Sequence, residues 1–67
     1  IKKLLIKQFA DRQLSLDDQQ IEFISKRIER SYSSIINIVE RIDTLALQRK
    51  KAISKYIIKE AINSLKT

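Results

Sequence analysis

The chain has 67 residues, which limits it to one small domain. It contains no Gly, Pro, Cys, His, Met or Trp, and 14 Lys and Arg against 8 Asp and Glu give a net charge of +6. Without His or Cys the chain lacks the commonest general base, the usual thiol nucleophile and the usual zinc ligands, and without Gly it lacks a Gly-rich phosphate loop. This composition predicts an all-α fold, a small compact bundle of about four helices.

Two further features of the sequence concern whether the domain is part of a longer protein and whether it enters a membrane. Because the chain contains no Met, we expect residues 1–67 to be a single helical subdomain of a longer protein. Its longest uninterrupted aliphatic run is Leu4, Leu5 and Ile6, far shorter than the roughly 20 apolar residues of a membrane-spanning helix. We therefore expect no membrane partner.

The first two predicted helices cover residues 1–11 and 17–28. Apolar residues on one face of the first helix are Ile1, Leu4, Leu5 and Phe9. In the second helix, Asp17 and Gln20 have the spacing of a capping box, in which each side chain accepts a hydrogen bond from the other residue's backbone N–H. The apolar stripe of the second helix is Ile21, Ile24 and Ile28, with Phe23 beside it.

The other two predicted helices cover residues 31–49 and 54–65, with Ser31 and Ser54 as N-caps. The predicted buried face of the third helix is Tyr32, Ile35, Ile36, Val39, Ile42, Leu45 and Ala46. The predicted buried face of the fourth is Ile57, Ile58, Ala61, Ile62 and Leu65. Since the connections are short, we expect consecutive helices to lie side by side.

An alternative arrangement of residues 17–49 stays open, because no Gly or Pro separates the two middle helices. The heptad a and d positions are Ile21, Ile24, Ile28, Ser31, Ile35, Ile38, Ile42 and Leu45. All but Ser31 are apolar, which is typical of a coiled coil and would give one continuous or domain-swapped helix. Against this, the e and g positions pair no Glu with Arg, and Tyr32, Val39 and Ala46 widen the apolar face. A wide apolar face favours the compact bundle.

The sequence presents no catalytic constellation and no metal site. A Ser–Lys dyad of Ser54 with Lys50 or Lys51 requires a buried lysine, whereas these two lysines lie in a solvated basic run. Ser54 fits the role of a helix cap better. We therefore expect that this fragment is not an enzyme by itself.

The densest basic cluster comprises Arg49, Lys50, Lys51, Lys55 and Lys59. Lys51, Lys55 and Lys59 recur at intervals of four, so they would form one stripe on a helix. Such a stripe would neutralise phosphates in a weak nucleic-acid contact, or bind an acidic partner. The competing interpretation is a solvated face that keeps a small domain in solution, since four aromatic residues supply little base stacking.

Several short motifs follow one another between residues 14 and 65. They are Leu14-Ser15-Leu16-Asp17-Asp18, Phe23-Ile24, Arg27-Ile28-Glu29-Arg30-Ser31-Tyr32, Val39, Ile42-Asp43, Ala46-Leu47-Gln48-Arg49-Lys50, Ala52-Ile53-Ser54 and Ile57-Ile58-Lys59-Glu60-Ala61-Ile62. In this order they resemble the C-terminal helical lid of the DnaA/Hda family, the AAA+ regulators of bacterial replication initiation. The resemblance is closer to the Hda-like lids than to the lid of DnaA.

The resemblance implies a lid that packs on an upstream nucleotide-binding core of the same chain. Hda-like proteins bind ADP, work with the sliding clamp loaded on DNA, and stimulate hydrolysis of ATP bound to DnaA. The implied partners are therefore DnaA and the sliding clamp, and the implied location is the bacterial cytoplasm. ADP or ATP with magnesium is implied for the parent protein, and no cofactor for the fragment.

Two other functions stay open at this point: a helical protein-interaction or coiled-coil module, and the lid of DnaA itself. An isolated lid also exposes the face that would pack on its core, so self-association of the fragment is expected. A dimer of the fragment would not by itself establish a dimer of the parent protein.

In this family the turn between the second and third helices carries an arginine, called sensor 2, that contacts the nucleotide phosphates. The resemblance places Ser33 at that position, and Arg30 lies three residues earlier, about one helical turn away. A hydroxyl cannot replace the planar fork of a guanidinium. The resemblance thus implies either that Arg30 substitutes for the missing arginine or that the phosphate contact is lost.

Overall fold

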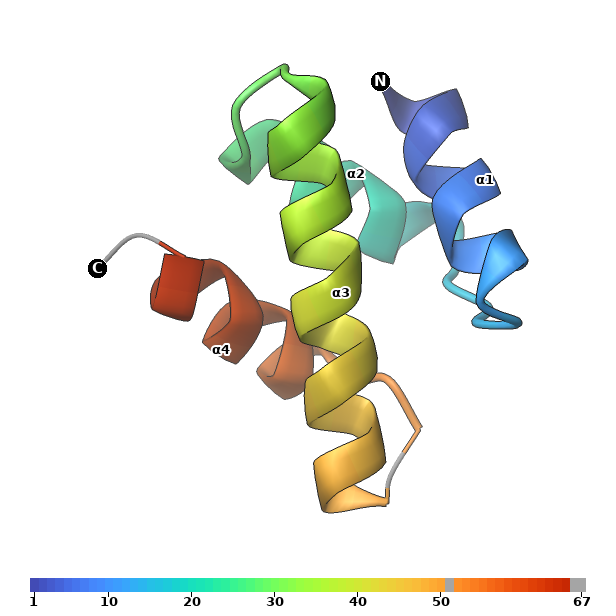
Figure 1. The fold of residues 1–67 in the computed structure, drawn as a ribbon, viewed down its shortest axis with the longest axis vertical. Helices are drawn as coiled ribbons and strands as arrows, with labels where there is room; N and C mark the ends of the chain where they lie inside the picture. Colours follow the sequence, from blue (N-terminus) through green and yellow to red (C-terminus); the bar gives the residue numbers. More distant parts are fainter. Residues whose placement is uncertain (51, 66–67) are drawn as a thin grey trace.

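The computed structural model describes residues 1–50 and 52–65. These residues form four helices and no strand (Figure 1), and the helices are α1 (Lys2–Asp11), α2 (Asp18–Arg27), α3 (Tyr32–Arg49) and α4 (Lys55–Leu65). The predicted all-α bundle is confirmed, and the predicted helix bounds differ from the observed ones by no more than about one residue. None of the described helices is long and apolar enough to cross a membrane.

Helix α1 ends in a turn that the sequence does not signal, because no Gly marks it. Gln13 adopts the left-handed region, with φ at 60°. The Gln13 N–H donates to the carbonyl of Ala10 at 2.9 Å, and the Leu14 N–H donates to the carbonyl of Phe9, also at 2.9 Å. This is the hydrogen-bond pattern of a Schellman motif. It turns Leu14 back onto the core that contains Phe9.

Helix α2 begins at the predicted capping box. The Gln20 N–H donates to Asp17 Oδ1 at 2.7 Å, and the Asp17 N–H donates to Gln20 Oε1 at 2.9 Å. These bonds satisfy two backbone donors that a helix start otherwise leaves without a partner. The Gln20 side chain also donates to the carbonyl of Ile53 at 3.4 Å, which ties the start of α2 to the segment before α4.

The chain breaks between α2 and α3, so the continuous helix over residues 17–49 is wrong for this chain. The backbone is extended at Ile28 (φ −111°, ψ 159°) and at Ser31 (φ −133°, ψ 152°). Ser31 Oγ accepts a hydrogen bond from the Ser34 N–H at 3.2 Å and caps α3. The single polar member of the heptad series is therefore the residue at which the helix restarts, because a serine competes for backbone hydrogen bonds better as a cap than within a helix.

The core draws on all four helices. Its buried members are Leu5, Phe9, Ile21, Ile24, Ile35, Ile38, Val39, Ile42, Leu45, Ile57, Ile58, Ala61 and Ile62. Three residues predicted for the core are exposed instead: Tyr32 is 64% exposed, Ile1 is 40% exposed and Leu65 is 39% exposed. Each lies at or beside the end of a helix, where neighbouring helices no longer cover the apolar face. Ile28, Ile36 and Ala46 are half-buried.

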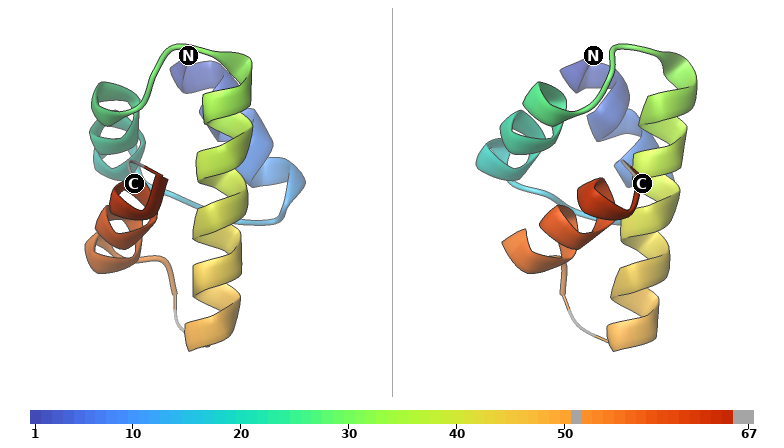
Figure 2. Two further views of the ribbon diagram at one scale, coloured as in Figure 1. Left: turned by 60° about the vertical axis from the view of Figure 1, so that its left-hand side comes forward. Right: turned by 90° about the vertical axis from the view of Figure 1, so that its left-hand side faces the viewer.

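The four helices form a closed ring in the order α1, α2, α4, α3 (Figure 2). Among the described residues the backbones of α2 and α3 do not approach one another, although these helices are consecutive. The expectation that consecutive helices lie side by side is therefore wrong for this pair. The extended backbone at Ile28 and Ser31 carries the chain across the bundle before α3 begins.

Candidate functional site

The two residues predicted for the sensor-2 region lie together at the start of α3. Arg30 is in the connection between α2 and α3, Ser33 is in the first turn of α3, and both are exposed. Ser31 Oγ lies 3.5 Å from Ser33 Oγ and donates to Ser34 Oγ at 2.8 Å. Hydroxyl groups and backbone N–H donors therefore gather at the positive end of the α3 dipole, an arrangement that suits an anion.

A surface hollow of about 660 Å³ lies next to this region. It is lined by Arg27, Ile28, Glu29, Ser34, Asn37, Ile62 and Leu65. Neither Arg30 nor Ser33 is part of the lining. The hollow instead lies between the end of α2, the first two turns of α3 and the last turn of α4.

The structure divides the predicted basic cluster. Arg49 Nη2 lies 2.5 Å and 2.7 Å from the two carboxylate oxygens of Glu60, so its charge is already paired within the bundle. Lys50 ends α3 in the left-handed region, with φ at 53°. Lys51 lies outside the described residues. Lys55 and Lys59 remain exposed on α4 and form no ion pair with any described carboxylate.

A different basic group, one that the sequence does not suggest, forms where α2 meets α4. The guanidinium carbon of Arg27 lies 3.7 Å from the centre of the Phe23 ring, and Arg27 Nη1 donates to the Phe23 carbonyl at 3.2 Å. Lys55 Nζ lies 5.7 Å from the centre of the same ring. The i, i+4 spacing of Phe23 and Arg27 in the sequence is enough to predict the stacking of these two side chains. Their meeting with Lys55 depends on the packing of α2 against α4.

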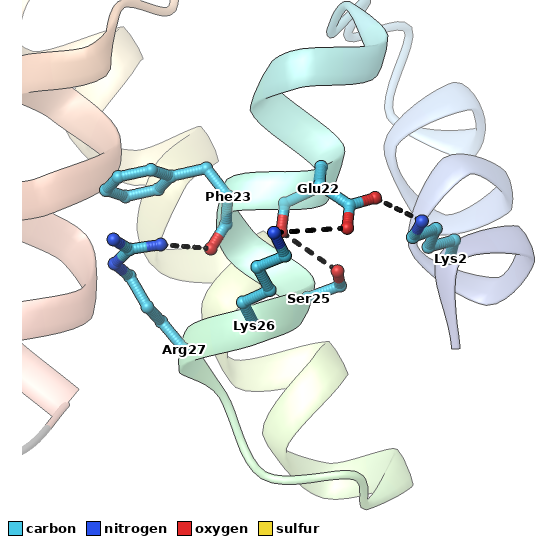
Figure 3. A network of polar contacts seen from close by, with 6 residues as sticks. All are labelled: Lys2, Glu22, Phe23, Ser25, Lys26 and Arg27. Carbon is cyan, nitrogen blue, oxygen red and sulfur yellow. Dashed lines mark hydrogen bonds and ion pairs between the residues drawn. The ribbon is translucent and has the colours of Figure 1, made fainter.

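On the opposite side of α2, a carboxylate forms ion pairs with two lysines (Figure 3). Glu22 pairs with Lys2 of α1 and, at 3.6 Å, with Lys26 one turn along α2. The hydrogen bond from Lys2, followed by the attraction of both lysines, lowers the pKa of the Glu22 carboxyl. Figure 3 shows Phe23 and Arg27 on one side of α2 and the Lys2–Glu22 pair on the other.

Charge pairs also join α3 to α1. Arg12 Nη1 lies 2.9 Å from Asp43 Oδ2, and Arg12 Nη2 lies 3.6 Å from Glu40 Oε1. These pairs fasten the end of α1 against the middle of α3. Within the described residues no group of three His, Cys, Asp or Glu side chains is placed to hold a metal ion.

The chain matches the model of a known protein family. A family model described as "Hda, lid domain" matches residues 2–62, which includes the first three helices and most of α4. No curated protein and no solved structure matches the chain.

Proposed function

The chain belongs to the Hda lid-domain family, and from this premise we propose that its parent protein promotes hydrolysis of the ATP bound to the replication initiator DnaA. The observation that carries the proposal is the extent of the family match, which runs through both caps and the α2–α3 break. Membership in the Hda family also favours this function over that of a DnaA lid or of a coiled-coil module.

A lid domain is not itself a catalytic domain, so the reaction belongs to other parts of the assembly. The parent's upstream core would hold ADP or ATP, and magnesium would be bound by that core, since the described residues assemble no metal-ligand cluster. We assign to the lid the task of packing on this core and presenting a cation to the nucleotide. DnaA and the DNA-loaded sliding clamp are the proposed partners, in the bacterial cytoplasm.

Arg30 is the residue we propose for the nucleotide contact. Ser33 is exposed in the first turn of α3, but its hydroxyl is neutral and cannot form a bidentate contact with a phosphate. Arg30 is exposed in the preceding connection and pairs with no described carboxylate. Its guanidinium is therefore available to phosphate oxygens at the end of α3 where the helix dipole is positive.

The test of this contact is ADP binding by the full-length protein. Loss of one charge-assisted hydrogen bond costs about 1.5–3 kcal/mol, so we expect Arg30→Ala to weaken ADP binding on the order of 10–100-fold. Ser33→Ala is expected to have little effect. Arg41→Ala, which removes another exposed cation from α3, is the matched control. Equal affinities for wild type, Arg30→Ala and Ser33→Ala would remove Arg30 from the site.

The test of the function is the conversion of DnaA-bound ATP to ADP. Full-length protein is added to ATP-loaded DnaA with the sliding clamp assembled on DNA, and the nucleotide that stays bound to DnaA is followed over time. We expect the wild type to accelerate the conversion and Arg30→Ala to accelerate it less. No acceleration by a folded wild-type protein that binds ADP would contradict the proposed activity and leave only the family membership.

A further inference from the structure

The contact between α2 and α4 differs from the other three helix contacts in its charges. Lys2 and Glu22 join α1 to α2, Arg12 and Asp43 join α1 to α3, and Arg49 and Glu60 join α3 to α4. Between α2 and α4 the described residues form no ion pair. One hollow along this contact is lined by three cations, Arg27, Lys55 and Lys59, and is here called the α2–α4 surface.

The α2–α4 surface has a defined shape. Its three cations line one hollow of about 320 Å³ together with Phe23, Ile62 and Asn63. The charged groups of Arg27 and Lys55 lie 3.7 Å and 5.7 Å from the centre of the same Phe23 ring. The ring attracts both cations through its face, while the two cations repel one another. Binding of an anion would relieve that repulsion.

The described carboxylates that line the neighbouring hollows, Glu29 included, form no ion pair with the cations of the α2–α4 surface. Asp17 forms the capping box at the start of α2, and Asp18 lies in the first turn, where it complements the helix dipole. Glu22 pairs with Lys2 and Lys26. None of these three carboxylates forms an ion pair with a cation of the α2–α4 surface.

From this arrangement we propose that the α2–α4 surface binds the phosphate backbone of duplex DNA. Lys55, Lys59 and Asn63 recur at intervals of four and form a row of hydrogen-bond donors about 12 Å long. Duplex DNA carries one negative charge about every 1.7 Å of helix axis, so several phosphates lie within reach of this row. An acidic helix offers only one carboxylate per turn of about 5.4 Å on a given face, which is a lower density of negative charge for the three cations.

The position of Phe23 favours a duplex over a single strand. Single-strand binding sites depend on aromatic rings that stack with bases. Arg27 lies over the Phe23 ring at 3.7 Å, so that face of the ring supports a cation instead of a base. The contact is thus with the backbone and independent of base sequence. This inference goes beyond the proposed function, and its test uses neither DnaA nor nucleotide.

The test is the salt dependence of duplex binding by the full-length protein. Fluorescence anisotropy with a labelled 20-base-pair duplex is measured between 50 and 200 mM salt, using Lys55→Gln/Lys59→Gln and the wild type. Loss of two phosphate contacts makes the negative slope of log affinity against log salt less steep by about 1.8 and weakens binding on the order of 10–100-fold at 0.1 M salt. Circular dichroism confirms that each variant is folded.

The matched control is Lys3→Gln/Lys7→Gln, which removes the same charge from exposed positions on α1, a helix whose backbone does not approach α4. We expect this control to keep the wild-type slope. An equal loss in both double variants, or no loss in either, would overturn the proposal. Displacement of the labelled duplex by polyglutamate as effectively as by unlabelled duplex of equal charge would also overturn it and assign the surface to an acidic protein.

Discussion

Helix α4 meets its two neighbours through different kinds of contact. Against α3, Arg49 and Glu60 neutralise one another at 2.5 Å. Against α2, Arg27 and Lys55 share the ring of Phe23, and neither forms an ion pair with a described carboxylate. In the sequence Arg49, Lys55 and Lys59 form one basic cluster, yet they divide between the two sides of α4. Cations that cluster in the sequence therefore form a binding surface only where the fold places no carboxylate to pair with them.

The largest expected effect is on the free energy of unfolding. It tests whether apolar packing, rather than ion pairing, holds α4 against α2 and α3. Ile58 is 1% exposed on α4, and truncation of a buried isoleucine costs about 2–5 kcal/mol of unfolding free energy. We expect Ile58→Ala to lower the urea midpoint strongly. Tyr56→Ala, at a position that is 85% exposed, is the control. A loss for Ile58→Ala as small as that for the control would show that the described core does not support α4.

The next largest effect on stability concerns the contact of Arg27 with the Phe23 ring, on the α2 side of α4. Phe23→Leu keeps the apolar bulk but removes the face on which Arg27 lies at 3.7 Å. A cation–π contact at an exposed site contributes about 0.5–1 kcal/mol, so we expect a loss of that size in thermal or urea unfolding. The Arg27→Gln variant should lose a similar amount, and the double variant should lose no more than either one. Full additivity would mean that ring and guanidinium act independently.

Removal of one cation should change the free energy of unfolding in opposite directions on the two sides of α4. Arg49→Gln breaks an exposed ion pair, which contributes about 0.2–1 kcal/mol, so stability falls. Lys59→Gln removes a like charge four residues from Lys55, and such a pair is unfavourable by about 0.2–0.5 kcal/mol, so stability rises. Urea unfolding at low salt measures both changes, and raising the salt should shrink both. Changes of the same sign would contradict the division of the cluster.

The smallest effect is a pH dependence on the α1 side of α2. The pKa of Glu22 is lowered by Lys2 and Lys26 below the ordinary carboxyl value of 4.5. A depressed pKa contributes stability above the unfolded value, and this stability is lost as pH falls from about 4.5 through the folded value. We expect Lys2→Gln to reduce the acid sensitivity of Tm more than Lys26→Gln does, because the Lys2 hydrogen bond is the largest cause. Equal curves for both variants would contradict that ranking.

Much of the fold follows from local signals in the sequence. Asp17 with Gln20, and Ser31, mark the starts of α2 and α3 because their side chains satisfy backbone donors only a few residues away. Apolar spacing likewise identifies most of the core. The turn at Gln13 was not predictable, since its left-handed backbone lacks the Gly that usually signals it.

The candidate sites depend on packing across the bundle, which spacing alone cannot show. The pairing of Arg49 with Glu60 and the meeting of Arg27 with Lys55 both join different helices. The sequence did not predict that α2 and α3 lie apart in the bundle, because the extended backbone between them is chosen by the tertiary arrangement. Arg30 and Ser33 were suggested by family resemblance, and their nucleotide role stays a prediction.

The most direct measurement of the central claim is an NMR titration of the ¹⁵N-labelled chain with a short DNA duplex. We expect the amide and side-chain signals of Arg27, Lys55 and Lys59 to shift first and to saturate together. The signals of Arg49, whose charge Glu60 already neutralises, should not shift. Shifts centred on Arg49, or spread evenly over all exposed lysines, would contradict the claim that the α2–α4 surface is the one prepared for phosphate.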